Sequence, residues 1–302
     1  SRACYAAHKT MLFDATPFHM PEPIFQDLAP YLWATTFPST GRMIRALAQS
    51  LESQGFFEPG AKVGFVSPDS PYFRASYQAD AVPAFGTFGV EFAEAAFVQN
   101  DSIPNTQSGL QQAAFRFQTQ GITHVVFYGN ALLAPLFMTN AEANAYFPRY
   151  GLTSFDQPKF TSEQWATPAS LEGAVGAGFS AAQDVADTEV AFPAPREQKC
   201  LDIYAADGHT WATRADAKIA LGYCDAVFLM MDASGRLGDR ALTAENISEA
   251  IYESGTSFQA PSSFGSRPVR GRFDVADTYR PMAYDADCDC FVYTGGPTRI
   301  PG

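Results

Sequence analysis

The sequence lacks long apolar runs, and none approaches the roughly 18 residues that a membrane-spanning helix requires. It also lacks clusters of basic residues: the 302 residues include 20 Lys and Arg against 32 Asp and Glu, a formal net charge of −12. A nucleic-acid-binding surface needs a basic stripe, so we expect no nucleic-acid partner. With 46% hydrophobic residues, the chain has the composition of a globular protein and the length for two lobes.

Catalytic motifs are missing as well. There is no Gly-x-Ser-x-Gly elbow, no His-Glu-x-x-His zinc motif and no Gly-x-x-x-x-Gly-Lys-Ser/Thr phosphate loop. The glycine-rich stretch 172–179 lacks the spacing of a phosphate-binding loop. The four histidines, His8, His19, His124 and His209, are far apart in the sequence, which favours surface or core positions over metal ligands. We therefore expect a binding protein rather than an enzyme, with no metal and no cofactor.

Cysteine is scarce and odd in number, with five residues. Cys200 and Cys224 flank two expected helical stretches, where a disulfide between antiparallel helices can form. Cys288 and Cys290 are separated by one residue, which is awkward for a mutual disulfide. We favour structural or oxidised cysteines outside the cytosol over buried thiols. No signal peptide is visible at the start of the sequence.

The segment 61–130 shows the clearest pattern in the chain. Continuous apolar runs alternate with helical stretches, which predicts βαβ units and a parallel sheet of an α/β fold. The expected strands are 61–67, 91–98 and 123–128, and the expected helices are 72–85 and 109–120. Ligands of open α/β sheets lie beyond the carboxyl ends of the strands, so 67–72 and 128–130 are expected to border a binding site.

The flanking segments are less regular. Strands are expected at 10–13, 31–36 and 152–155, and the proline-rich segment 17–30 is not expected to be regular for long. Helices are expected at 41–54, 131–147 and 242–254, followed by a β-hairpin near the end of the chain. The stretch 195–231 is helical in pattern, with an expected core of Ile203, Tyr204, Trp211, Ile219, Tyr223 and Val227.

The order of these elements resembles that of the type I periplasmic binding proteins. It is most similar to the substrate-binding subunits of ABC importers in the branched-chain amino-acid (Leu/Ile/Val) group. The resemblance spans nearly the whole chain and rests on 3–16, the crossover 31–41, the Val-Gly-Phe-Val run at 63–66 followed by Asp-Ser-Pro-Tyr at 69–72, and the Val-Val-Phe-Tyr-Gly run at 125–129.

The resemblance implies two Rossmann-like lobes with parallel sheets, joined by three hinge crossovers and holding a ligand in the cleft. Family members carry a further segment before the one that matches Cys4, so the first lobe is expected to be incomplete and Cys4 to lack a partner. The implied organisation is the remaining part of lobe I at 1–38, lobe II at 39–180, helices returning to lobe I at 181–260, and C-terminal strands and hinge at 261–302.

The resemblance also implies a set of ligand-binding positions. Backbone N–H and hydroxyl groups near Ala15 and Thr16 would hold a carboxylate, Tyr72 would close over the ligand, Tyr128 and Asn130 would line the cleft, and Asp156 would pair with an amino group. Structural alternatives exist: Tyr72 can pack as an ordinary helix residue on its neighbour, and Thr16 and Asp156 can serve as turn residues.

The implied function is extracytoplasmic solute binding, in a periplasmic or cell-surface lipoprotein. The ligand would be an amino acid or a small organic acid or amide, and the partners would be ABC permease subunits. The alternative is a ligand-sensing or regulatory module of the same fold that signals to a partner protein.

Overall fold

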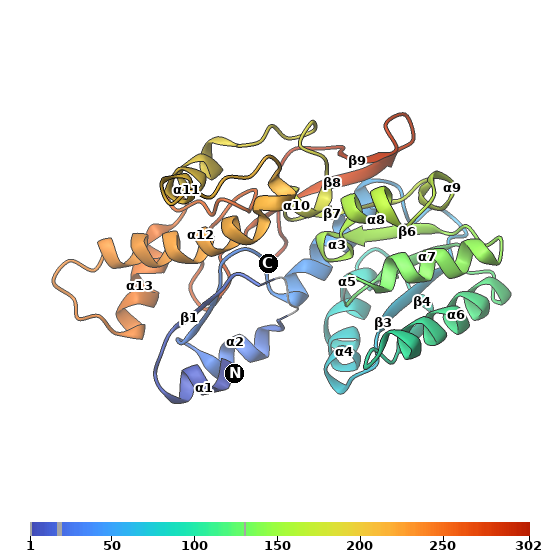
Figure 1. Cartoon of the computed structure of the whole chain (residues 1–302). Helices are drawn as coiled ribbons and strands as arrows, with labels where there is room; N and C mark the ends of the chain where they lie inside the picture. The colour runs from blue at the N-terminus through green and yellow to red at the C-terminus, as the bar shows by residue number, and fades with distance from the viewer. Residues whose placement is uncertain (1, 17–19, 130) are drawn as a thin grey trace. The chain divides into compact units, whose positions relative to one another are not determined.

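The computed structural model describes residues 2–16, 20–129 and 131–302. The chain divides into two compact units (Figure 1). Unit 1 contains Ser1–Arg42, Phe179–Ala182 and Val190–Tyr279, and unit 2 contains Met43–Gly178, Gln183–Glu189 and Arg280–Gly302. Each unit is therefore assembled from segments that are distant in the sequence.

Unit 2 is built on a mixed sheet with the strand order β10-β8-β7-β6-β5-β3-β4 and with β9 paired to β8. The strands from β4 to β7 are parallel, and the pairs β7–β8 and β8–β9 are antiparallel. Their bounds are β3 Val63–Pro68, β4 Phe92–Val98, β5 His124–Phe127, β6 Arg149–Thr153, β7 Val175–Gly178, β8 Thr278–Asp285, β9 Cys290–Tyr293 and β10 Thr298–Arg299. The parallel sheet predicted from the buried apolar runs is confirmed.

Helices cover both faces of this sheet. Gly64 pairs with Val125 of β5 and Gly151 pairs with Val126. Because successive residues of a strand face opposite sides of the sheet, the two glycines mark opposite faces. A Cβ on Gly151 would lie 2.9 Å from Leu51 of α3, and one on Gly64 would lie 2.5 Å from Phe117 of α6, so each glycine admits a helix close to the sheet. The helices are α3 Thr40–Ser53, α4 Pro71–Ser76, α5 Val82–Gly86, α6 Ile103–Thr119, α7 Leu133–Ala143, α8 Pro158–Gln164, α9 Pro168–Leu171 and α10 Ala181–Asp184, with a π-helical turn at Tyr77–Ala81 and a 3-10 turn at Ser154–Asp156.

Unit 1 contains a two-stranded parallel sheet and five helices among its described residues. The elements are α1 Arg2–Ala7, β1 Leu12–Asp14, α2 Glu22–Leu28, β2 Leu32–Ala34, α11 Pro195–Ala206, α12 Arg214–Gly235 and α13 Ala244–Ser254. Trp33 of β2 is at the centre of the core: its ring centroid lies 5.2 Å from those of Tyr252 and Phe273, and its Nε1 donates to Ser248 Oγ at 3.3 Å. This contact set binds β2 to α13.

The disulfide between Cys200 and Cys224 joins α11 to α12 in unit 1, with an S–S distance of 2.07 Å. Both cysteines are buried, at 0% and 6% exposure, and pack with Ala217 and Leu221. The remaining cysteine without a disulfide, Cys4, is exposed.

In the proline-rich segment, which is not expected to be regular for long, the seven residues Glu22–Leu28 form α2. Pro23 lies in the first turn of the helix, where a missing N–H costs no intrahelical hydrogen bond. Residues 17–19 lie outside the described part of the chain. The helix expected at 109–120 starts earlier, at Ile103, because the side chain of Ser102 caps it by accepting a hydrogen bond from Asn105 N.

The predicted core of the stretch 195–231 is largely wrong. Ile203, Ile219, Tyr223 and Val227 are exposed, with Ile219 at 68%. The buried face of α12 instead carries Leu221 and Leu229 together with small residues, among them Ala217, Ala220, Gly222 and Cys224. Because α12 has apolar residues on more than one face, periodicity alone does not show which face is buried.

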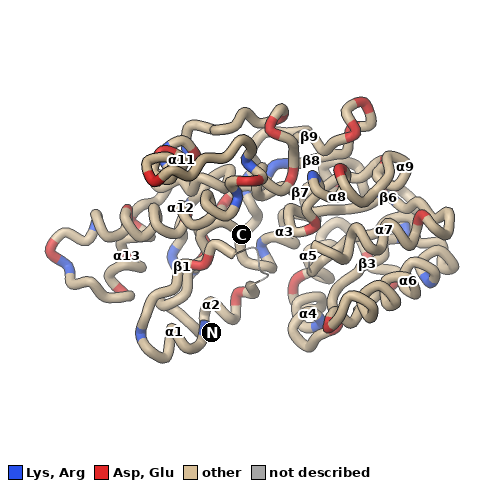
Figure 2. Tube along the Cα trace, viewed as in Figure 1, with Lys and Arg blue, Asp and Glu red and all other residues tan. Residues whose placement is uncertain are grey.

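Acidic and basic residues are interspersed along both units (Figure 2). Within the described ranges, the structure has no helix with both the length and the apolar character that crossing a membrane requires.

Candidate ligand-binding site

The strand order of unit 2 predicts where a ligand can bind. The chain passes from β3 to β4 on one side of the sheet, whereas β5 is followed by β6 and β7 on the other side. The order reverses between β3 and β5, and open α/β sheets bind ligands beyond the carboxyl ends of the strands at such a point. In this chain those ends are Pro68 and Phe127.

The loop after β3 presents two aromatic rings. Ser70 caps α4 by accepting a hydrogen bond from Phe73 N at 3.2 Å, and Pro71 occupies the first helical turn. This start of the helix places Tyr72 and Phe73 next to each other, with ring centroids 4.8 Å apart. Among the described residues, the hydroxyl of the buried Ser67 in β3 has no hydrogen-bond partner. The loop thus combines the Tyr72 and Phe73 rings with the Ser70 hydroxyl, and the Ser67 hydroxyl is buried in the strand before it.

The residues after β5 are packed tightly. Tyr128 is 3% exposed, its hydroxyl lies 2.7 Å from Ser76 Oγ, and its ring centroid lies 5.6 Å from that of Phe73. A Cβ on Gly129 would lie 2.4 Å from the Pro68 side chain, so only glycine lets the backbone pass here. The predicted ligand residue Asn130 lies outside the described residues.

Asp156 follows β6 and is buried. Its Oδ2 accepts hydrogen bonds from Thr153 N at 2.7 Å and from Thr153 Oγ1 at 3.0 Å, which forms a capping box for the turn Ser154–Asp156. Burial raises the pKa of the Asp156 carboxyl to about 7, and the hydrogen bonds from Thr153 oppose this shift. These contacts are those of the structural alternative, and the pairing of Asp156 with an amino group stays a prediction.

In unit 1, Ala15 and Thr16 follow the end of β1. The Asp14 carboxylate accepts hydrogen bonds from Thr16 N at 2.9 Å and from the Thr16 hydroxyl, and it forms an ion pair with Arg2 at 2.7 Å. The Asp14 side chain therefore holds the Thr16 loop in a turn, and Thr16 itself is exposed. The backbone O of Asp14 accepts from Thr35 N at 3.0 Å, which links the ends of β1 and β2.

A second buried carboxylate lies beyond the end of β2, and the sequence did not single it out. Asp225 of α12 accepts hydrogen bonds from Thr36 Oγ1 at 2.6 Å and from Ser262 N at 3.0 Å. Burial raises the pKa of Asp225 to about 7. One signal was available: Asp225 is a single acidic residue within the apolar part of a helical pattern, where a carboxylate needs a partner.

No protein-family model and no curated protein matches this sequence. Several solved structures match nearly the whole chain. A branched-chain amino acid ABC transporter protein from Thermus thermophilus, with bound valine, has 18% identity and a TM-score of 0.65; the match covers 99% of this chain and 74% of that one. The solute-binding protein of an ABC transporter from R. palustris, in complex with benzoate, has 12% identity and a TM-score of 0.69, with the same two coverages.

A substrate-binding protein of an ABC transporter from Desulfitobacterium hafniense, in complex with Leu, has 15% identity and a TM-score of 0.64; the match covers 97% of this chain and 75% of that one. The fold is that of the type I periplasmic binding proteins. In this fold the predicted residues Tyr72 and Tyr128 come together within unit 2, because both rings contact Phe73. Ala15 and Thr16 belong to unit 1.

Among residues 2–16, 20–129 and 131–302, no group of three His, Cys, Asp or Glu side chains is arranged to hold a metal ion. His124 is buried at the start of β5, and burial together with the nearby Arg149 lowers its pKa. Because His124 is the first residue of β5, it lies at the amino end of the strand, at the opposite edge of the sheet from Tyr72 and Tyr128.

Proposed function

We propose that this protein is an extracytoplasmic solute-binding protein of an ABC importer, and that its solute is a small molecule with a carboxylate group. The proposal is supported by the fold and by the three matched structures, whose ligands valine, Leu and benzoate each carry a carboxylate. ABC permease subunits are the partners that this function requires.

The edge formed by Tyr72, Phe73 and Tyr128 carries this proposal. Tyr72 and Phe73 are half-buried and offer an aromatic wall for an apolar or aromatic side group, and Tyr72 adds a hydroxyl. A carboxylate is bound by O–H and N–H donors, and within unit 2 the loop after β3 contains the Ser70 hydroxyl. An amino acid and an aromatic acid both meet this description, so the choice between them is left to the binding assay.

The direct test is a thermal-shift screen of the whole chain, followed by calorimetric titration of each hit. The panel contains the aliphatic amino acids, the corresponding amines and amides, and benzoates with and without ring hydroxyls. A solute at 100 times its Kd stabilises the folded state by about 2.7 kcal/mol, which raises Tm measurably. We expect carboxylates to stabilise the protein and the matched amides and amines to have little effect. A panel without any stabilising carboxylate would contradict the proposal.

Variants assign the binding residues. Tyr72→Ala is expected to weaken the solute at least tenfold, because it removes an aromatic wall and a hydroxyl group. Tyr223→Ala is the matched control, since Tyr223 is exposed on α12 in unit 1 and its loss should not change affinity. Thr16→Ala, with the exposed Thr10→Ala as its control, tests the loop after β1 separately.

A further inference from the structure

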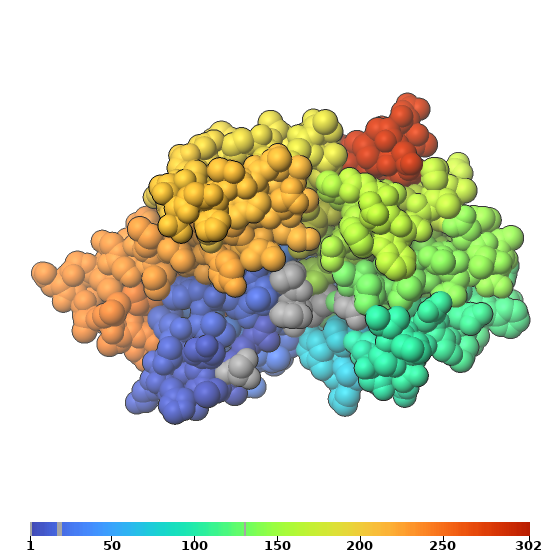
Figure 3. Space-filling view, in the orientation of Figure 1, coloured from blue at the N-terminus to red at the C-terminus, as the bar shows by residue number. Residues whose placement is uncertain are grey.

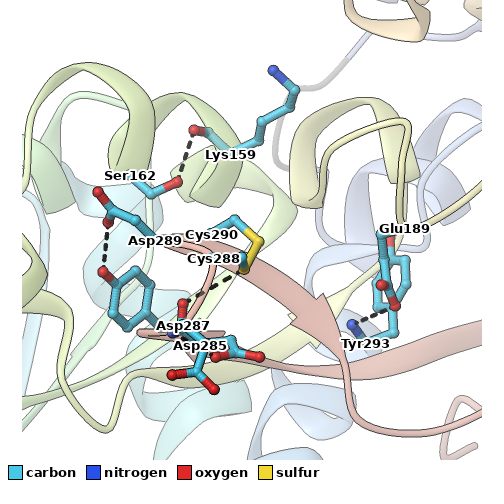
Figure 4. The surroundings of a disulfide bond; sticks show 10 residues. Lys159, Ser162, Glu189, Asp285, Asp287, Cys288, Asp289, Cys290 and Tyr293 are labelled. Carbon is cyan, nitrogen blue, oxygen red and sulfur yellow. Dashed lines mark hydrogen bonds between the residues drawn. A yellow bond between two sulfur atoms is a disulfide. The ribbon is translucent and has the colours of Figure 1, made fainter.

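The hairpin of β8 and β9 carries a second disulfide, between Cys288 and Cys290 (Figure 4). The expectation that one intervening residue disfavours this bond is wrong. Asp289, the intervening residue, has a φ of +52°, a left-handed conformation that aspartate tolerates better than most residues and that turns the two cysteines toward each other. Cys290 is the first residue of β9 and pairs with Asp285, so the disulfide closes the tip of the hairpin.

The two disulfides differ in how far their sulfur atoms are exposed to solvent. The hairpin tip projects from the surface of unit 2 (Figure 3), and Cys288 is exposed. Cys200 and Cys224, by contrast, are buried between α11 and α12. A thiolate reduces a disulfide by attacking one sulfur directly, so an exposed sulfur reacts and a buried one is protected.

The tip is also strongly acidic. Asp285 ends β8, and Asp287 and Asp289 lie in the turn that follows; Asp285 Oδ1 accepts from Asp287 N at 2.9 Å, and Asp289 Oδ1 accepts from the Tyr284 hydroxyl at 2.5 Å. The nearby Lys159 does not neutralise this charge, because its Nζ binds Glu163 at 2.6 Å and points away from the disulfide (Figure 4). An attacking thiolate is itself negative, so the local field selects against thiols that carry further negative charge.

We propose that the Cys288–Cys290 disulfide is an exchange site for small thiols that are cationic or neutral. The incoming thiolate attacks Cys288 Sγ and forms a mixed disulfide, while the Cys288–Cys290 bond breaks and its electron pair leaves on Cys290 Sγ, which takes a proton from water. With a dithiol, the second thiolate then attacks the reagent sulfur of the mixed disulfide. Cys288 leaves as a thiolate, and the dithiol becomes a cyclic disulfide; two electrons pass from the dithiol to the protein.

The hairpin favours Cys288 as the attacked sulfur. Cys288 is exposed, whereas Cys290 is partly buried at the start of β9. The sulfur of Cys288 lies 3.6 Å from the Asp285 carbonyl oxygen, so after complete reduction the Cys288 thiol has an acceptor in place. The proposal does not depend on the identity of a transported solute, because all of these contacts lie within the hairpin and its neighbours.

The first experiment compares the two disulfides in one folded molecule. The native protein is treated with the neutral dithiol dithiothreitol, quenched with iodoacetamide at timed points, and analysed by peptide mass spectrometry. Cys288 and Cys290 are expected to become alkylated at least tenfold faster than Cys200 and Cys224, with the free thiol of Cys4 as the reference for alkylation. Equal rates for the two disulfides, or no opening of the hairpin disulfide while the protein stays folded, would overturn the proposal.

The second experiment tests the charge preference. Reduction rates with cysteamine and with mercaptoethanesulfonate are compared after correction for the thiolate fraction of each reagent. We expect cysteamine to react about tenfold faster at low ionic strength, with the difference shrinking in high salt. The double variant Asp287→Asn with Asp289→Asn should reduce this ratio, whereas Asp207→Asn, at an exposed position in unit 1, should not. A ratio near one in the unaltered protein, or a ratio unchanged in the double variant, would refute the charge preference.

Discussion

The buried ion pair between Arg42 and Asp274 offers the sharpest test of how unit 1 is held together. Arg42 is 2% exposed and Asp274 is 1% exposed. Asp274 also accepts a hydrogen bond from Ser39 N at 2.6 Å and lies 3.2 Å from Arg272 Nε, while Arg42 reaches Asp277 at 3.2 Å. This network links the segment after β2 to the segment 272–277. A parallel backbone bridge between Ala34 and Asp274 joins the same two segments.

The perturbation is Asp274→Asn. Asparagine keeps an acceptor for Ser39 N but removes the charge, which leaves the buried guanidinium of Arg42 with a longer contact to Asp277. Breaking a buried pair on one side costs about 3–5 kcal/mol, because the remaining charge is uncompensated. Since Asp277 still compensates part of the charge, we expect a loss of about 3 kcal/mol in the free energy of unfolding.

The assay is urea unfolding followed by tryptophan fluorescence, since Trp33 lies in the core of unit 1 and reports its loss. Asp232→Asn is the matched control: Asp232 forms a part-exposed pair with Arg236 at 2.8 Å on the surface of α12, and its loss should cost less than about 1 kcal/mol. The reasoning fails if Asp274→Asn lowers the free energy of unfolding no more than Asp232→Asn does. It also fails if the double variant Asp274→Asn with Arg42→Met is no more stable than Asp274→Asn alone, because removing the uncompensated charge should restore part of the loss.

Three further changes have defined outcomes. Because burial raises the pKa of Asp156 to about 7, the folded state binds its proton more tightly than the unfolded state. As the pH rises from about 4 to about 7, this group should therefore lower the free energy of unfolding by at most on the order of 4 kcal/mol. Asp156→Asn should reduce the pH dependence of urea-derived stability over that range, and the contribution of Asp225 should remain. Gly129→Ala should lower stability by about 1–3 kcal/mol in urea unfolding, because its Cβ would lie 2.4 Å from a proline side chain, whereas Gly86→Ala, with no atom within 4 Å, should not. Replacing Cys200 and Cys224 with serine should lower the thermal midpoint and cost about 2–4 kcal/mol relative to the oxidised unaltered protein, with the reduced unaltered protein as the control for the serine side chains; a reduced protein as stable as the oxidised one would contradict this.

The parallel sheet was predictable from sequence because its strands are buried on both faces. Val63–Pro68 and His124–Phe127 are buried throughout, so each appears as a continuous apolar run between helical stretches. The buried face of α12 was not predictable in the same way. Ile219 and Tyr223 lie outward, whereas Ala217 and Leu221 pack around the disulfide that joins α12 to α11.

The sequence predicts only those residues of the candidate site that directly follow a strand. Tyr72 and Tyr128 follow the ends of two strands of a parallel sheet, and the fold brings such ends together, so strand order alone places both near Phe73. Asp225 depends on a different kind of contact. Its partner Thr36 is 189 residues away along the chain, and a spacing of that length leaves no periodic signal in the sequence. A buried carboxylate must be hydrogen-bonded, but which distant hydroxyl satisfies it is decided by how α12 packs against β2, where Leu229 and Ala233 share a core with Leu32 and Trp33.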